Sequence, residues 1–135
     1  MAETEKPKLE LVRTRLERVD AQTIKNTPQA GERLRVITDW NYVINKKTAD
    51  MAVISATCRT RFVPQGLLEI TTEFSLTYRC KEDVTRDQLE QNMEYLLLPA
   101  GEQNALIVGQ LTDKMRGTPM VVSPKVNLQD RRNLN

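Results

Sequence analysis

The side chains that most often perform acid–base or metal chemistry are sparse in this sequence. The chain contains no histidine, so it lacks the commonest general base and metal ligand. Its carboxylates are scattered and show no pairing typical of acid–base catalysis, as at Asp39, Asp50, Asp83 and Asp87. The segment GEQNALIVG lacks the spacing and the lysine of a phosphate-binding loop. Nothing points to catalysis by serine or lysine, so we expect a protein that is not an enzyme and uses no cofactor.

Two cysteines are the next candidates for chemistry, as a disulfide or as metal ligands. Cys58 and Cys80 fall on the two strands of a predicted hairpin that turns at residues 64–66. In that pairing Cys58 lies near Thr72, and Cys80 is further along the same strand, roughly 26 Å away at ~3.3 Å per residue. A disulfide tolerates a Cα separation of only about 7 Å. We therefore expect two reduced, buried thiols and no thiolate metal site.

Charge and hydropathy give no sign of nucleic acid or membrane as a partner. The formal net charge is only +2. The densest basic group, Arg13, Arg15 and Arg18 with Arg33 and Arg35, has no interleaved aromatic residues on which bases could stack. The N-terminus has no cationic start followed by an apolar run, and YLLLPA is too short to span a bilayer. We expect a cytoplasmic protein that neither binds nucleic acid nor inserts into membranes.

The remaining chemistry is binding through apolar surface. Aromatic residues make up only 4% of the chain, and four of them could come together: Trp40 and Tyr42, which are two residues apart, with Tyr78 and Tyr95. They could line a groove or fill the core. For Trp40 the two interpretations stay open. For the three tyrosines the sequence favours core or a subunit interface.

Three strands are predicted, and Trp40, Tyr42 and Tyr78 lie on two of them. Apolar residues or threonine occupy alternate positions over 34–44, 52–62 and 68–80, so each stretch has one dry face. On the other face of the predicted hairpin, Arg61 lies opposite Glu69, and Arg59 lies between Glu69 and Glu73. An antiparallel sheet with one dry face and one charged face needs a cover on the dry side.

Helices that could form this cover follow in the sequence. Thr85 and Gln88 form a predicted capping box, and Leu89, Met93, Leu96 and Leu97 then share one helical face. Pro99 suits the first turn of a second helix. Val108, Leu111 and Met115 continue the apolar stripe, and Gly117 ends it. The predicted class is α+β: an antiparallel sheet with C-terminal helices on one face.

The ends of the chain are less clearly patterned. Residues 9–24 fit a helical stripe through Leu9, Val12, Leu16 and Val19, but their composition also allows an edge strand. Residues 25–32 are rich in turn formers. We expect one domain over residues 9–128, with flexible segments at 1–8 and 129–135.

The C-terminal third resembles a known family. The stretch LLLPAGEQNALIVGQLTDKMRGTPMVVSPKVNL is similar to the end of the SecB-like protein-export chaperones. The matching elements are Leu97-Leu98-Pro99 before the long helix, Arg116-Gly117-Thr118 at its end, and an apolar segment from Pro119 to Val126. The resemblance implies a four-stranded antiparallel sheet followed by helices. It also implies a strand over residues 9–24, a dimer of dimers, and an apolar segment after Gly117 that returns along the fold.

The resemblance also implies a function. Such chaperones are ATP-independent holdases that bind unfolded or partly folded polypeptides in apolar grooves of an oligomer. Carried onto this chain, the groove would be lined by Trp40, Tyr42, Tyr78, Tyr95 and Leu98, and the oligomer interface would contain Val108, Leu111 and Met115. A translocation ATPase could dock at Asp20, Glu69 and Glu73. The alternatives are a dedicated chaperone of a toxin–antitoxin pair and a non-chaperone oligomeric adaptor of the same fold.

Overall fold

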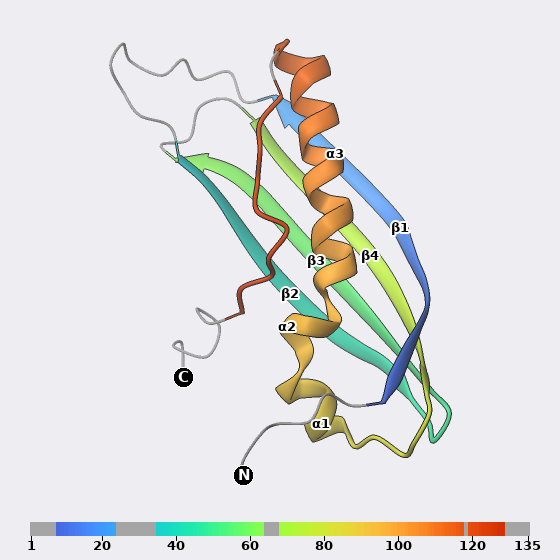
Figure 1. Cartoon of the computed structure of the whole chain (residues 1–135). Helices are drawn as coiled ribbons and strands as arrows, with labels where there is room; N and C mark the ends of the chain where they lie inside the picture. Colours follow the sequence, from blue (N-terminus) through green and yellow to red (C-terminus); the bar gives the residue numbers. More distant parts are fainter. Residues whose placement is uncertain (1–7, 24–34, 64–67, 118, 129–135) are drawn as a thin grey trace.

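A four-stranded sheet with helices on one face makes up the part of the chain that the structure describes. The structure is a computed structural model, and it describes residues 8–23, 35–63, 68–117 and 119–128. The strands are β1 (Leu9–Thr23), β2 (Arg35–Lys47), β3 (Met51–Val63) and β4 (Leu68–Cys80). The helices are α1 (Arg86–Gln91), α2 (Met93–Leu96) and α3 (Leu98–Arg116). Residues 119–128, here called the strap, run back beside α3 on the same face of the sheet (Figure 1).

The sheet is antiparallel and has the strand order β1-β4-β3-β2, so β1 and β2 are its edges. The predicted hairpin register is confirmed, because Cys58 pairs with Thr72 and Arg61 with Glu69. Both cysteines are buried and free, as expected. The predicted turn at residues 64–66 lies outside the described residues.

The two faces of the sheet differ as the alternation predicted. On β3 and β4 the even-numbered residues from Ala52 to Thr60 and from Leu68 to Cys80 are buried. The other face carries ion pairs, with Arg59 2.7 Å from Glu69 and Arg61 3.1 Å from Asp39. The helices and the strap therefore lie on the dry face, and the charged face is open.

Within the ambiguous stretch 9–24, the described residues form the strand β1 (Leu9–Thr23), which contains two bulges. The register against β4 shifts between Leu11 and Arg13 and again between Leu16 and Arg18. Each bulge adds one residue to β1 and so moves the inward face by one position. The inward positions become Leu9, Leu11, Thr14, Leu16, Val19 and Ala21. This mixed spacing explains why the apolar residues also fitted a helical stripe.

The helices begin and end at the predicted signals. Thr85 and Gln88 form the capping box of α1, with the Gln88 N–H donating to the Thr85 hydroxyl at 3.1 Å. Pro99 lies in the first turn of α3, and Gly117 ends it with a φ of 81°. The first predicted helix is divided, because α1 and α2 meet at Asn92. Within the described ranges, no helix is long and apolar enough to cross a membrane.

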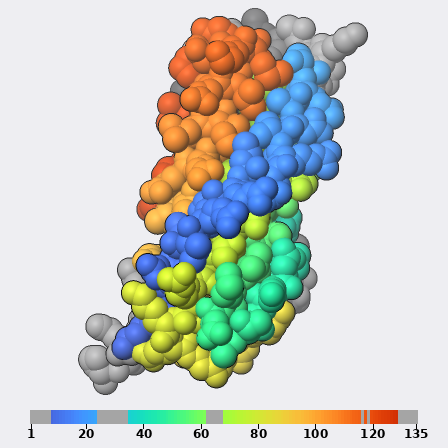
Figure 2. Space-filling view, turned by 90° about the vertical axis from the view of Figure 1, so that its right-hand side faces the viewer, coloured from blue at the N-terminus to red at the C-terminus, as the bar shows by residue number. Residues whose placement is uncertain are grey.

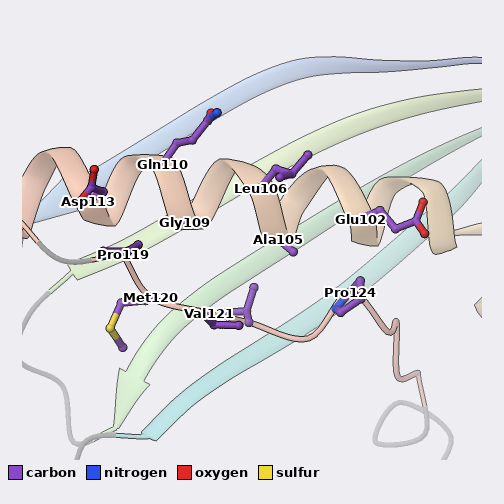
Figure 3. A pocket seen from close by; sticks show the side chains of 11 residues that line it. Glu102, Ala105, Leu106, Gly109, Gln110, Asp113, Pro119, Met120, Val121 and Pro124 are labelled. Carbon is purple, nitrogen blue, oxygen red and sulfur yellow. The ribbon is translucent and has the colours of Figure 1, made fainter.

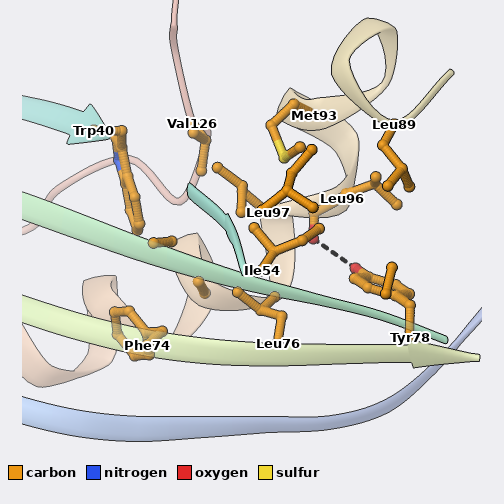
Figure 4. Close-up of a cluster of buried hydrophobic side chains, with 14 of the residues drawn as sticks. Trp40, Ile54, Phe74, Leu76, Tyr78, Leu89, Met93, Leu96, Leu97 and Val126 are labelled. Atoms are coloured by element: carbon orange, nitrogen blue, oxygen red, sulfur yellow. Dashed lines mark hydrogen bonds between the residues drawn. The ribbon is translucent and has the colours of Figure 1, made fainter. Parts of the chain in front are cut away.

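The main core lies between the sheet and the helices (Figure 4). Trp40 stacks on Phe74 with ring centroids 6.4 Å apart, and the Tyr78 hydroxyl donates to the Leu96 carbonyl at 2.5 Å. Thr72 on β4 donates to Asn104 on α3 at 2.7 Å, which satisfies two buried polar side chains. A second, smaller cluster contains Leu68, Ile70, Val108 and Val122.

The strap contributes buried side chains to both core clusters. Its side chains at Val122, Val126 and Leu128 are buried, and Met120 packs partly buried against the second cluster. The apolar segment after Gly117 therefore returns along the fold, as the resemblance implied. The predictions of flexible ends at 1–8 and 129–135, and of a turn-rich break at 25–32, fall outside the described residues except for Lys8.

Candidate functional site

Three of the predicted groove residues line one hollow. This hollow, here called the aromatic pocket, has a volume of about 270 Å³ and lies where β1, β4, α2 and the start of α3 meet. Tyr78, Tyr95 and Leu98 all contribute to it. Apart from one carboxylate the lining is apolar or aromatic: Leu9, Leu11, Tyr78, Tyr95, Leu96, Leu98, Pro99 and Glu102.

The two tyrosines of the aromatic pocket are in different environments. Tyr78 is buried and hydrogen-bonded to the backbone of α2, and burial raises its pKa to about 12, with a smaller contribution from nearby Tyr95. The Tyr78 side chain is thus uncharged and held in place where it lines the aromatic pocket. Tyr95 has 51% of its surface exposed, so its ring is accessible to another molecule. The pocket is suited to holding an apolar or aromatic side chain and contains no activated nucleophile.

Trp40 and Tyr42 lie away from the aromatic pocket. Both are on β2, the edge strand furthest from β1. Trp40 is only 6% exposed and packs in the core against Phe74. Tyr42 is partly buried, and its hydroxyl donates to the Glu90 carboxylate of α1. Of the two interpretations left open for Trp40, the subunit therefore places it in the core.

A second, larger hollow runs along the junction of α3 and the strap (Figure 3). This hollow, here called the seam groove, has a volume of about 650 Å³. Its walls are largely apolar and come from two segments: Glu102, Ala105, Leu106, Gly109, Gln110 and Asp113 of α3, and Pro119, Met120, Val121, Val122 and Pro124 of the strap. Leu106 is 67% exposed and Val121 92% exposed. The apolar helical stripe predicted from the sequence included neither Leu106 nor Val121.

The residues predicted for an oligomer interface differ in accessibility. Val108 is fully buried within the second cluster, and Leu111 packs partly buried against it. Met115 is exposed. Val108 is therefore occupied by contacts inside the subunit, and Met115 is the most accessible of the three.

The acidic residues predicted for partner docking lie on the charged face of the sheet, each beside an arginine. Arg18 is 3.7 Å from Glu73 and 3.8 Å from Asp20. Glu69 is 2.7 Å from Arg59. This part of the face is therefore mixed in charge rather than an acidic patch.

Neither metal binding nor thiol chemistry is favoured by the described residues. Among them, no group of three or more Cys, Asp or Glu side chains could hold a metal ion. Burial raises the pKa of the Cys58 thiol to about 12, and burial also raises that of Cys80. Both thiols are therefore protonated and unreactive near neutral pH.

Comparison with known proteins identifies the fold. No protein-family model and no curated protein matches the sequence. The chain is similar to the SecB-like chaperone Rv1957 of Mycobacterium tuberculosis, in complex with a ChAD peptide from the Rv1956 HigA1 antitoxin, with a TM-score of 0.71 and 16% identity over 86% of this chain and 90% of that one. It is also similar to a protein of unknown function from Streptococcus agalactiae, with a TM-score of 0.51 and 10% identity over 87% of this chain and 96% of that one. The chain therefore has the SecB-like α+β fold.

Proposed function

We propose that this protein is an ATP-independent holdase chaperone that binds unfolded segments of other polypeptides. The observation that carries the proposal is the aromatic pocket, an open apolar hollow on a SecB-like fold with no catalytic group in it. A fold alone does not define a function, so the pocket and its surroundings are the main argument.

Exposed apolar side chains extend the aromatic pocket along β1. Leu11, which lines the pocket, is 41% exposed, and Leu16 and Val19, which are inward positions further along β1, are similarly open. Figure 2 shows β1 lying along this side of the molecule beside α3. Burying one Leu- or Phe-sized side chain stabilises a complex by about 1.5–3 kcal/mol, so a few such contacts are enough for reversible binding.

The structural neighbour supports polypeptide as the ligand class. Rv1957 is described in complex with a peptide, which is a short polypeptide segment bound by a chain of the same fold. The apolar pocket and the open row on β1 are suited to such a ligand, because an extended peptide presents apolar side chains at regular intervals.

We also propose that the protein acts as an oligomer, a dimer of dimers. An exposed apolar row on an edge strand, with Leu106 and Met115 exposed on α3, is surface that a second copy of the chain could cover. Native mass in solution tests this, and a stable monomer would contradict it. The proposal does not include docking of a translocation ATPase, because Asp20, Glu69 and Glu73 lie beside arginines.

The holdase activity is tested by light scattering. A chemically denatured client protein is diluted into buffer without nucleotide, with this protein at an equal molar concentration. We expect aggregation to slow. Substitution Tyr95→Ser should weaken this effect, because it removes an exposed ring from the aromatic pocket.

The matched control is Val43→Ser. Val43 is 61% exposed on β2, away from the aromatic pocket, so loss of its exposed apolar side chain should leave the suppression unchanged. The holdase proposal is abandoned if the wild-type protein does not slow aggregation. If Tyr95→Ser suppresses aggregation as well as Val43→Ser does, the binding site lies elsewhere.

A further inference from the structure

We propose that the strap occupies a second polypeptide-binding groove, and that an extended aliphatic client segment binds there by displacing it. This inference rests on the proposed function and adds a second site of different chemistry. The groove is the channel beside α3, on the dry face of the sheet, in which residues 119–128 lie (Figure 1). In this structure the chain's own segment fills the place that the client would take.

The strap is bound much as an extended peptide would be. Its buried side chains, Val122, Val126 and Leu128, fall on even-numbered positions, and Pro124 between them is exposed. Outward residues are exposed, and Val121 reaches 92%. The strap is not a strand of the sheet, so its position does not depend on a β-ladder. Aliphatic side chains entering successive sites are its main attachment.

Side chains of the helices accept hydrogen bonds from the two ends of the strap. The Met120 N–H donates to the Thr112 hydroxyl at 2.7 Å, and the Leu128 N–H donates to the Glu94 carboxylate at 2.8 Å. The Thr112 hydroxyl itself donates to the Val108 carbonyl at 2.7 Å, which orients its oxygen toward the strap. Both acceptors contact backbone N–H groups, so they would accept equally from another polypeptide backbone of different sequence.

The α3 side of the groove is shaped for a polypeptide backbone. A methyl group placed on Gly101 would lie 2.0 Å from the Pro124 carbonyl oxygen, so the strap backbone directly contacts α3 there. At Gly109 a methyl group would lie 3.8 Å from the Met120 carbonyl oxygen, an ordinary contact. The open seam groove of about 650 Å³ beside the strap shows that the strap does not fill the junction completely.

The chemistry of the strap defines the ligand that the groove would accept. Inward positions hold branched aliphatic side chains, whereas the aromatic pocket is walled by two tyrosines. A client segment that competes with the strap would be extended and uncharged on its inward side, with Val, Leu or Ile at alternating positions. The two sites would thus divide a client into an aromatic part and an aliphatic part.

Competition by the strap would lower the apparent affinity for clients. When a site is free in only a fraction of the molecules, the apparent Kd is the intrinsic Kd divided by that fraction. Loosening the strap should therefore strengthen client binding, whereas damage to an ordinary structural segment would weaken it. The direction of the change in client affinity therefore distinguishes a strap that competes with clients from a purely structural segment.

The test compares Val122→Ser with Val121→Ser. Both changes replace a valine of the strap by serine and leave α3 and the sheet unchanged, but only Val122 is buried, so only its loss loosens the strap. The probe is a permanently unfolded, reduced and carboxymethylated globular protein, with binding measured by fluorescence anisotropy. We expect Val122→Ser to bind it more tightly than Val121→Ser, by about tenfold if the groove is free in roughly one molecule in ten.

Hydrogen exchange on the wild-type protein provides a second readout that needs no variant. We expect the probe to accelerate exchange at the Met120 and Leu128 amides, which donate to Thr112 and Glu94, while β4 amides stay protected. If Val122→Ser does not fold, Leu128→Ser replaces it, because this change removes another buried side chain of the strap and should also tighten binding.

The outcomes separate the two proposals. If the wild-type protein does not bind the probe at all, the holdase proposal fails. If it binds, but Val122→Ser binds no more tightly than Val121→Ser and strap exchange is unchanged by the probe, the strap is structural and this inference is wrong. A synthetic peptide of residues 119–128 should compete with the probe for Val122→Ser, and absence of competition would also contradict the inference.

Discussion

The neighbouring strands β1 and β4 both turn apolar side chains to one face of the sheet, but these side chains differ greatly in exposure. They pair over their whole length, and Leu16 on β1 lies directly opposite Phe74 on β4. Both strands turn apolar side chains to the same face of the sheet. On β4 these side chains are 0–1% exposed at Ile70, Phe74 and Leu76, whereas on β1 Leu11 and Leu16 are 41% and 42% exposed.

The difference comes from position in the sheet. β4 is flanked by β1 and β3, and the helices and the strap cover its inward face. β1 is an edge strand, so within the described ranges no strand pairs with its outer side. An apolar pattern thus stabilises the fold on β4 and leaves binding surface on β1. Regions of similar sequence pattern therefore serve different purposes here.

The largest expected effect is on the covered strand. Phe74→Ala should lower the free energy of unfolding by about 3–5 kcal/mol, because it leaves a cavity beneath Trp40 in a core that is closed on all sides. Urea denaturation followed by tryptophan fluorescence measures this. A loss below ~1 kcal/mol would mean that β4 is no better covered than β1.

The second prediction concerns pH and again involves the covered strands. Burial raises the pKa of Cys58 on β3 from 9.0, and that of Tyr78 on β4 from 10.0, each to about 12. Both groups are neutral at low pH, and the unfolded chain loses these protons first as the pH rises. Their contribution to stability is therefore complete below about pH 9 and is lost toward pH 12, by an amount on the order of a few kcal/mol.

Urea midpoints between pH 7.5 and 10.5 measure this alkaline loss of stability. Cys58→Ala removes one of the two groups and should make the midpoint less dependent on pH over this range. If the wild-type midpoint does not fall above pH 9, these groups are not buried as described.

The smallest expected effect is on the open strand. Leu16→Ala should cost about 1 kcal/mol of unfolding free energy, because its side chain is already partly in water. The same urea experiment measures it, with Phe74→Ala as its matched partner across the pair. A cost as large as that at Phe74 would indicate that a second chain covers β1 in solution, and dilution of the protein should then reduce it.

Much of the fold could be predicted from local patterns. Alternation placed the inward residues of β3 and β4, since successive side chains on a strand point to opposite faces. Thr85, Gln88, Pro99 and Gly117 marked helix ends because capping depends on neighbouring residues. β1 was ambiguous because bulges at two register shifts depend on its pairing with β4, which the local sequence does not encode.

The candidate site was predicted only in part. Tyr78, Tyr95 and Leu98 meet in one pocket, but Trp40 and Tyr42 lie on β2, at the opposite edge of the sheet from β1. Residues on one strand face look alike in sequence whether a helix covers them or not. Leu106 and the strap residue Val121 were missed as lining residues of the seam groove. This groove exists only because the strap passes along α3, which the local sequence does not show.

By itself, the sequence determined the strands β2, β3 and β4 with the dry side of each, the helices that follow them, and the absence of histidine-based chemistry. Only the tertiary structure decided which dry surface is closed and which is open. The physical reason is that periodicity and capping act between residues close in sequence, whereas burial depends on segments that are distant in the chain and meet only in the folded subunit.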